Sequence, residues 1–165
     1  MEKIIAYKAF HANWTAYRGF QYQVGETYEL DDKITIKING PGFHACLHPI
    51  DCDDYYDITE WRDGKPKFAQ VILHGDIVKS EWNSCIVGRK ITIAKEIDLA
   101  TFFQGKTVRK SNGETIVFGP DGKITNAKRF STWSLKSCKD TLYTPSRKDK
   151  HHRSEGLEPT PQPDP

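Results

Sequence analysis

Residues 68–97 read FAQVILHGDIVKSEWNSCIVGRKITIAKEI, and this stretch decides the fold class. It contains two apolar runs, Phe68–Lys79 and Ser84–Ile97, which are rich in β-branched residues and typical of buried strands. Gly75 interrupts the first run, and the second alternates apolar and polar residues near its end. The stretch therefore predicts a fold built mainly on β-strands.

Further strands are predicted upstream. Lys3–Phe10 is apolar and rich in β-formers, and Phe20–Leu30 alternates apolar and polar residues until Gly25. Lys33–Ile38 shows the strictest alternation, with three isoleucines on one face and polar residues on the other. Glycines and a proline end that run, and a short apolar segment, Phe43–Leu47, follows.

One short helix is predicted at Pro49–Ile58. Pro49 has the fixed φ that suits a first helical position. Asp51, Asp53 and Asp54 follow where the positive end of the helix dipole favours carboxylates. The predicted fold class is therefore α+β, mostly antiparallel β with one short helix packed on the sheet.

A second unit is predicted after residue 100. Three short strands, Gly105–Lys110, Glu114–Phe118 and Lys123–Phe130, are separated by turn sequences and form a β-meander. So small a sheet needs support, and we expect it to pack on the first unit. The final stretch has few apolar residues and four prolines, which is typical of disorder. The expected organisation is a core at 1–100, a basic β-meander at 101–145 and a disordered tail at 146–165.

The basic charge of the chain is local. The 165 residues have a formal net charge of +2, but residues 1–100 hold 12 Lys and Arg against 15 Asp and Glu, whereas 101–150 hold 11 against 4. Such a segment attracts a polyanion or an acidic protein face; the alternative is a solvated basic surface. The predicted partner is a protein or a nucleic acid, contacted by Arg109, Lys110, Lys128, Arg129 and Trp133.

The sequence shows no sign of membrane insertion or export. No run reaches the roughly 18 apolar residues of a spanning helix, and the first residues lack the features of a signal peptide. The four cysteines, at positions 46, 52, 85 and 138, have no C-x-x-C spacing. We therefore expect a cytoplasmic protein with free thiols and no membrane contact.

Two clusters contain residue types that bind metals. His44, Cys46, His48 and Cys52 lie within nine residues, but neighbouring side chains on one strand face diverge, which favours buried thiols and hydrogen-bonded imidazoles. A carboxylate cluster at positions 51, 53, 54 and 57 could hold Mg²⁺ if two members faced one cleft, and a solvated helix face explains it more simply. No metal site is predicted.

Familiar catalytic motifs are missing from the sequence. We find no Ser-His-Asp set, HExxH, P-loop or GxGxxG pattern, so the readily signalled hydrolases, zinc proteases and phosphate-loop enzymes are disfavoured. The sequence leaves open whether the protein is an enzyme.

Residues 4–98 resemble an uncharacterised domain found in phage and prophage proteins. The resemblance rests on Tyr7–Phe10, on Arg18–Tyr28, on the run Gly42–Asp51 that contains GFHAC, and on the pair Tyr55-Tyr56. It implies a phage-associated origin and one compact domain, and it supplies no activity.

A second, weaker likeness is to the ADP-ribosyltransferase fold. It rests on Tyr7-Lys8-Ala9, on Gly42-Phe43-His44, on Tyr55 and on the strand that ends in Gly75. This likeness implies that NAD would be the cofactor; Glu81 and Glu96 are candidates for the catalytic carboxylate by location alone, and no catalytic residue is assigned. The ligand-binding residues expected from the two resemblances are Tyr7, Lys8, Arg18, Phe43, His44 and Tyr55.

Three functional hypotheses follow. The leading one is a small phage-type accessory protein that binds a host macromolecule or nucleotide signal, needs no cofactor and works in the bacterial cytoplasm. The second is an NAD-dependent ADP-ribosyltransferase or an inactive nucleotide-binding relative. The third is a structural component of a virion or of its assembly.

Overall fold

The computed structural model describes residues 2–56 and 66–125. Two long antiparallel strands, β4 (Lys67–Lys79) and β5 (Cys85–Glu96), form the frame of the fold, as the two apolar runs predicted. Their pairing shifts register twice, once next to Gly75, whose φ of +77° is a backbone conformation that glycine tolerates best. These bulges bend the long strands, so each can pair with different partners along its length.

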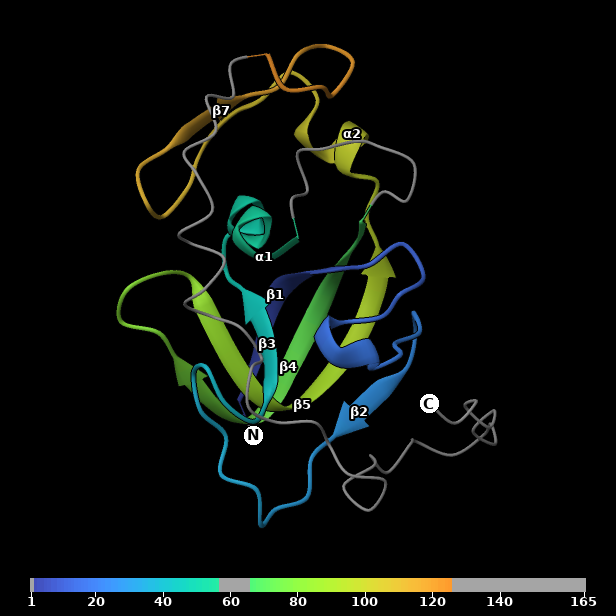
Figure 1. The fold of residues 1–165 in the computed structure, drawn as a ribbon, viewed down its shortest axis with the longest axis vertical. Helices are drawn as coiled ribbons and strands as arrows, with labels where there is room; N and C mark the ends of the chain where they lie inside the picture. The colour runs from blue at the N-terminus through green and yellow to red at the C-terminus, as the bar shows by residue number, and fades with distance from the viewer. Residues whose placement is uncertain (1, 57–65, 126–165) are drawn as a thin grey trace.

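Four strands close into a small barrel (Figure 1). The strand β1 (Lys3–Phe10), confirmed as predicted, pairs with β4, and β3 (Phe43–Cys46) pairs with both β1 and β5. Because β4 and β5 also pair with each other, the ring β5-β3-β1-β4 returns to β5. A short strand, β2 (Thr27–Glu29), extends the sheet beside β5. The described chain is thus mostly antiparallel β with few short helices, which is compatible with the predicted α+β class.

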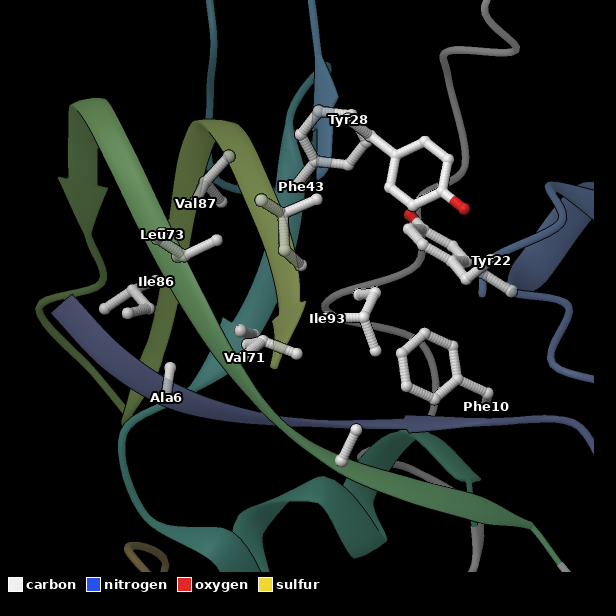
Figure 2. Packing of buried hydrophobic residues seen from close by; sticks show 14 of the residues in the cluster. Ala6, Phe10, Tyr22, Tyr28, Phe43, Val71, Leu73, Ile86, Val87 and Ile93 are labelled. Atoms are coloured by element: carbon white, nitrogen blue, oxygen red, sulfur yellow. The ribbon is translucent and has the colours of Figure 1, made fainter. Parts of the chain in front are cut away.

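The barrel interior is filled by aromatic rings on one side and aliphatic side chains on the other (Figure 2). The ring of Tyr22 lies 5.1 Å from that of Phe10 and 5.2 Å from that of Tyr28. The opposite side is formed by fully buried residues of the long strands, namely Val71, Leu73, Ile86 and Val87, and the buried Ile93 lies beside the Phe10 ring. This alternating burial explains why periodicity in these strands was a reliable signal.

The predicted strand at Lys33–Ile38 was wrong. The structure has irregular backbone between two turns there, and Ile36 is buried while Ile34 and Ile38 pack against the inner core. The backbone hydrogen bonds are local, as in Ile34 N–H to Asp31 O at 3.0 Å. The alternation of isoleucines therefore reflects alternating burial of side chains in a loop. It does not reflect the pairing of a strand in a sheet.

The predicted strand at Phe20–Leu30 was too long. Only β2 forms within it, and it is preceded by a short 3₁₀ turn, η1 (Tyr17–Gly19). Gly25 has a φ of +90° and its N–H donates to Ile93 O at 2.7 Å, so the chain turns before it joins the sheet. The apolar side chains upstream reach the core from irregular backbone.

A second layer covers part of the outer face of the barrel. It contains η2 (Pro49–Cys52), α1 (Asp53–Tyr56), α2 (Leu99–Phe103) and a hairpin of β6 (Thr107–Arg109) and β7 (Thr115–Val117). These elements share an apolar cluster with Ala9, Cys46 and Phe68 of the barrel. The helix expected at Pro49–Ile58 is present as the turn η2 followed by α1, and its last two residues lie outside the described part.

The helix α2 was not predicted. Asp98 caps its first turn by accepting a hydrogen bond from Thr101 N–H at 3.0 Å, and the boundary expected at residue 100 falls within α2. Of the third meander strand, the structure describes only an isolated bridge between Phe118 and Ile124. The rest of that strand and the tail at 146–165 lie outside the described residues.

Within residues 2–56 and 66–125, no helix has the length and apolar character needed to cross a membrane.

Candidate functional site

A buried carboxylate, Asp51, joins three segments of the chain. Asp51 lies in η2 and is 3% exposed. Ser84 Oγ donates to its Oδ2 at 2.5 Å, and Ser111 N–H donates to its Oδ1 at 2.8 Å. The hydroxyl of Ser111 also donates to Oδ2. Hydrogen bonds to a carboxylate are stronger than neutral ones, so Asp51 fixes the end of the β4–β5 loop and the β6–β7 turn against η2.

Beside Asp51, Lys110 is buried among carboxylates. Its Nζ lies 3.2 Å from Asp53 Oδ2 and 3.7 Å from Glu114 Oε2, and it also forms an ion pair with Asp54. Burial alone would lower the pKa of Lys110, but the hydrogen bond to Asp54 and the charge of Asp53 outweigh burial and raise this pKa from 10.5. We call the set the latch; its residues are Asp51, Asp53, Asp54, Ser84, Lys110 and Ser111.

The ion pairs of Lys110 predict a loss of stability at alkaline pH. Because the folded pKa is raised, this contribution is fully present below the unfolded value of 10.5 and is lost as pH rises through the folded pKa. We expect Lys110→Met to lower the free energy of unfolding at neutral pH by about 2 kcal/mol and to remove this alkaline loss. Urea unfolding across the alkaline range measures both effects. The matched control is Lys123→Met, since the Lys123 side chain is 75% exposed; equal behaviour of the two variants would contradict the prediction.

Ser111, His48 and Asp51 lie together, but their geometry is not that of a catalytic triad. In a triad the imidazole uses one nitrogen for serine and the other for the carboxylate. Here one nitrogen, His48 Nδ1, lies 3.3 Å from Ser111 Oγ and 3.8 Å from Asp51 Oδ2. The serine hydroxyl already donates to the carboxylate directly. The cluster therefore positions the β6–β7 turn through the hydrogen bonds of Ser111 to Asp51.

Three of the residues expected to bind a ligand, Lys8, Phe43 and His44, are buried. Lys8 is 6% exposed, its Nζ donates to His44 O at 2.9 Å, and it lies 5.7 Å from the ring centroid of Phe10. Phe43 is 4% exposed and packs among the core rings. His44 is also buried, with Nδ1 3.2 Å from Gly42 O. A lysine held by a carbonyl oxygen and aromatic faces is a packed interior group and does not face an open cleft.

The other expected ligand residues belong to the second apolar cluster. Tyr7 stacks on Phe68 at 5.9 Å, and Tyr55 packs against the same cluster. The side chain of Arg18 lies outside the described part. Of the two candidate carboxylates, Glu96 pairs with Lys67 at 2.8 Å and Glu81 is exposed in the β4–β5 loop. The structure thus does not gather these residues around one site.

The three described cysteines are free, as expected, and all are buried. A hydrogen bond of the protonated Cys46 thiol with Cys52, and then burial, raise the pKa of Cys46 well above 9.0. Cys52 Sγ itself donates to Tyr7 O at 3.4 Å. Among the described residues, no group of three or more His, Cys, Asp or Glu side chains could hold a metal ion.

The raised pKa of Cys46 predicts low chemical reactivity. Only the thiolate attacks a disulfide reagent, so we expect Cys46 and Cys52 to react roughly 100-fold or more slowly than a free thiol in the folded protein. A Cys138→Ser variant keeps the one cysteine outside the described part from contributing. An aromatic disulfide reagent with and without urea measures the rates, and fast labelling without urea would contradict the prediction.

The basic residues expected to contact a partner differ in their surroundings. Arg109 is exposed on β6, whereas Lys110 is buried in the latch. Lys128, Arg129 and Trp133 lie outside the described residues. Other hairpin-region cations have close neighbours: Lys106 lies 4.5 Å from the Phe102 ring, and Lys123 lies 3.6 Å from Asp121 Oδ2.

The surface beside the latch carries an unusually exposed aromatic residue. Trp82 is 89% exposed in the β4–β5 loop, two residues before Ser84. Leu47, which is 37% exposed, donates its N–H to Ser84 O at 2.8 Å, and the adjoining His48 side chain is 63% exposed. In Figure 1 the β4–β5 loop and the β6–β7 turn project on the same left-hand side of the molecule. We call this surface the Trp82 face; its residues are Leu47, His48, Trp82 and Ser111.

These features define a small, closed antiparallel β-barrel domain with a docked hairpin and, in the described chain, an exposed aromatic loop at the docking site. Comparison with family models then assigns the domain to a family. The chain belongs to the family described as a domain of unknown function (DUF7666), whose model matches residues 4–105. Comparisons with curated proteins and with solved structures found no match. The expectation that residues 4–98 form an uncharacterised family domain is confirmed, and phage origin and ADP-ribosyltransferase likeness stay predictions.

Proposed function

We propose that this domain is a non-catalytic binding module that recognises a protein through the Trp82 face. The observation that carries the proposal is the 89% exposure of Trp82. Covering a tryptophan ring removes roughly 200 Å² of surface from water. An exposed ring therefore lacks several kcal/mol of hydrophobic free energy that a binding partner could supply. Tryptophan and arginine are also the residue types most enriched at the energetic centres of protein interfaces.

The loop that presents Trp82 is held in place before any partner arrives. Ser80 N–H donates to Cys85 O at 2.9 Å, and Cys85 N–H donates to Asn83 Oδ1 at 3.0 Å. The buried Ser84–Asp51 hydrogen bond anchors the end of the loop. A preorganised loop loses less conformational entropy on binding than a mobile one, which supports a recognition role for this loop.

The charges of the hairpin favour a protein over a nucleic acid. A phosphodiester chain is bound by many unneutralised cations. In the described hairpin region Lys110 is surrounded by carboxylates and Lys123 lies near Asp121, so acidic side chains offset part of the positive charge there. A partly neutralised surface with an exposed aromatic ring suits a mixed apolar and polar protein surface.

The cellular setting is part of this proposal. Free, buried thiols suit a reducing compartment, and we place the module in the cytoplasm. If the chain has the phage origin that its resemblance implies, the partner is a host protein.

The test compares two exposed aromatic residues. The full chain and its Trp82→Ser and Tyr17→Ser variants are used as bait in crosslinking, and the affinity of each for the recovered partner is then measured by calorimetry. We expect Trp82→Ser to weaken binding about 30-fold or more, and Tyr17→Ser, whose ring is 45% exposed elsewhere, to leave it unchanged.

Two outcomes would overturn the proposal. One is equal affinity of all three baits. The other is a partner that is nucleic acid, revealed by nuclease sensitivity and a steep decrease of affinity with salt that Arg109→Ala, combined with substitutions of Lys128 and Arg129, removes.

A further inference from the structure

Four charged or titratable side chains stand in one row across the outer face of the barrel. Lys3 on β1 is paired with His74 on β4, His74 with Lys90 on β5, and Lys90 with Glu29 on β2. Directly opposite residues of antiparallel strands point to the same face with Cβ atoms about 5 Å apart. Their neighbours Leu73 and Ile91 are fully buried, so this row faces outward. Three consecutive positions of the row are basic.

The carboxylate at the end of the row neutralises only part of this charge. Lys90 Nζ lies 3.0 Å from Glu29 Oε2, and a lysine ammonium has two further donors. Lys3 and, when protonated, His74 are excess positive charge within the row. Like charges at opposite positions destabilise a sheet, so protonation of His74 between the two lysines lowers stability unless an anion joins the row.

The imidazole of His74 is held in a fixed orientation. Its Nε2 lies 2.9 Å from Thr92 Oγ1, which lies 2.8 Å from Thr27 Oγ1 in the next row. The second ring nitrogen, Nδ1, is the atom through which the ring can reach a ligand in the row. Burial, and then the charges of Lys3 and Lys90, lower the pKa of His74 from 6.5, while Glu29 opposes them. The positive potential at the ring therefore exceeds what Glu29 offsets.

We propose that Lys3, His74 and Lys90 form a binding site for a phosphate group on the outer face of the barrel. Two ammonium groups and one oriented imidazole supply the charge-assisted donors that a phosphate accepts. Ile5, 60% exposed, and Ile72 occupy the next row and offer an apolar surface for the organic part of a phosphate ester. The site shares no residue with the Trp82 face and does not depend on that proposal.

The first test follows the titration of His74 by NMR in the labelled full chain. Inorganic phosphate is compared with chloride at matched ionic strength. Because a bound anion stabilises the imidazolium, we expect phosphate to raise the pKa of His74 and to bind more tightly as pH falls through that pKa. Each unit by which the pKa rises corresponds to tenfold tighter binding by the protonated form.

Matched variants distinguish a specific phosphate site from non-specific attraction of phosphate to surface charge. We expect Lys3→Gln/Lys90→Gln to abolish the phosphate-specific shift, and Lys33→Gln/Lys37→Gln, which removes two exposed loop lysines, to retain it. Calorimetry with His74→Gln gives a second readout, with phosphate binding weakened about tenfold or more. Adenosine monophosphate in place of inorganic phosphate distinguishes the sources: tighter binding of the nucleotide indicates an organic phosphate, and equal binding indicates the free ion.

The proposal is overturned by either of two results. One is a His74 pKa that is the same in phosphate and in chloride. The other is an equal phosphate effect in both double variants, which would assign it to diffuse surface charge.

Discussion

Replacing Asp51 with asparagine lowers the free energy of unfolding by about 3 kcal/mol and releases the β6–β7 hairpin from the barrel. Asparagine keeps the shape of the side chain but removes the charge, and its NH₂ group faces hydroxyls that donate in the native protein. A hydrogen bond to a buried charge is worth about 1.5–3 kcal/mol, and Asp51 accepts one from Ser84 and two from Ser111. Urea unfolding measures the loss, and hydrogen exchange of the amides of residues 107–117 measures the release.

The control for Asp51→Asn is Asp32→Asn. The Asp32 side chain is 98% exposed and lies 3.9 Å from Arg89, so its loss changes stability by less than about 1 kcal/mol. A similar, small effect of both substitutions, with unchanged protection of the hairpin, would show that Asp51 does not hold the hairpin in place.

Replacing Gly42 with alanine destabilises the barrel by about 3 kcal/mol or more. Gly42 has a φ of +137°, a conformation that residues with a Cβ rarely adopt, and a Cβ built there lies 2.0 Å from Val87 Cγ1. Val87 is fully buried in the inner core, so it has no space into which to move. Thermal and urea unfolding measure the effect.

Two comparisons isolate the overlap with Val87. Gly25→Ala introduces backbone strain at a φ of +90° with nothing within 4 Å of the new Cβ, and we expect it to lower stability by only about 1–2 kcal/mol. In the Gly42→Ala background, Val87→Ala removes the clashing methyl and should recover part of the loss. If Gly42→Ala is no more damaging than Gly25→Ala, the close approach of Gly42 to Val87 does not limit the packing.

The parts of the fold that could be predicted from sequence are those set by local periodicity. Lys3–Phe10, Phe68–Lys79 and Ser84–Ile97 alternate because one face of each strand is buried, and all three are strands within one or two residues. Lys33–Ile38 alternates just as well but forms irregular backbone between two turns. Strand formation also needs a hydrogen-bonding partner, and periodicity within one segment carries no information about the partner.

The latch could not be predicted because its members are distant in sequence. Asp51 lies 33 residues from Ser84 and 60 from Ser111. Each had a local explanation: Asp51 as a dipole-stabilising residue and Ser111 as part of a turn. The basic sequence around Lys110 predicts that it contacts a partner. The three carboxylates around it come from α1 and from the turn that precedes β7. Only the topology brings these charges together, and the same is true of Lys3, His74 and Lys90.

The ring of strands has one narrow seam. Tyr7 and Cys46 are the single register pair that joins β1 to β3, whereas β1 and β4 share eight. Cys52 of η2 donates to Tyr7 O at this seam, and the neighbouring Asp51 is tied to the hairpin. The hairpin therefore acts as a clasp over the weakest join of the barrel. A force that pulled the hairpin away would separate β1 from β3 before it broke the long β4–β5 ladder.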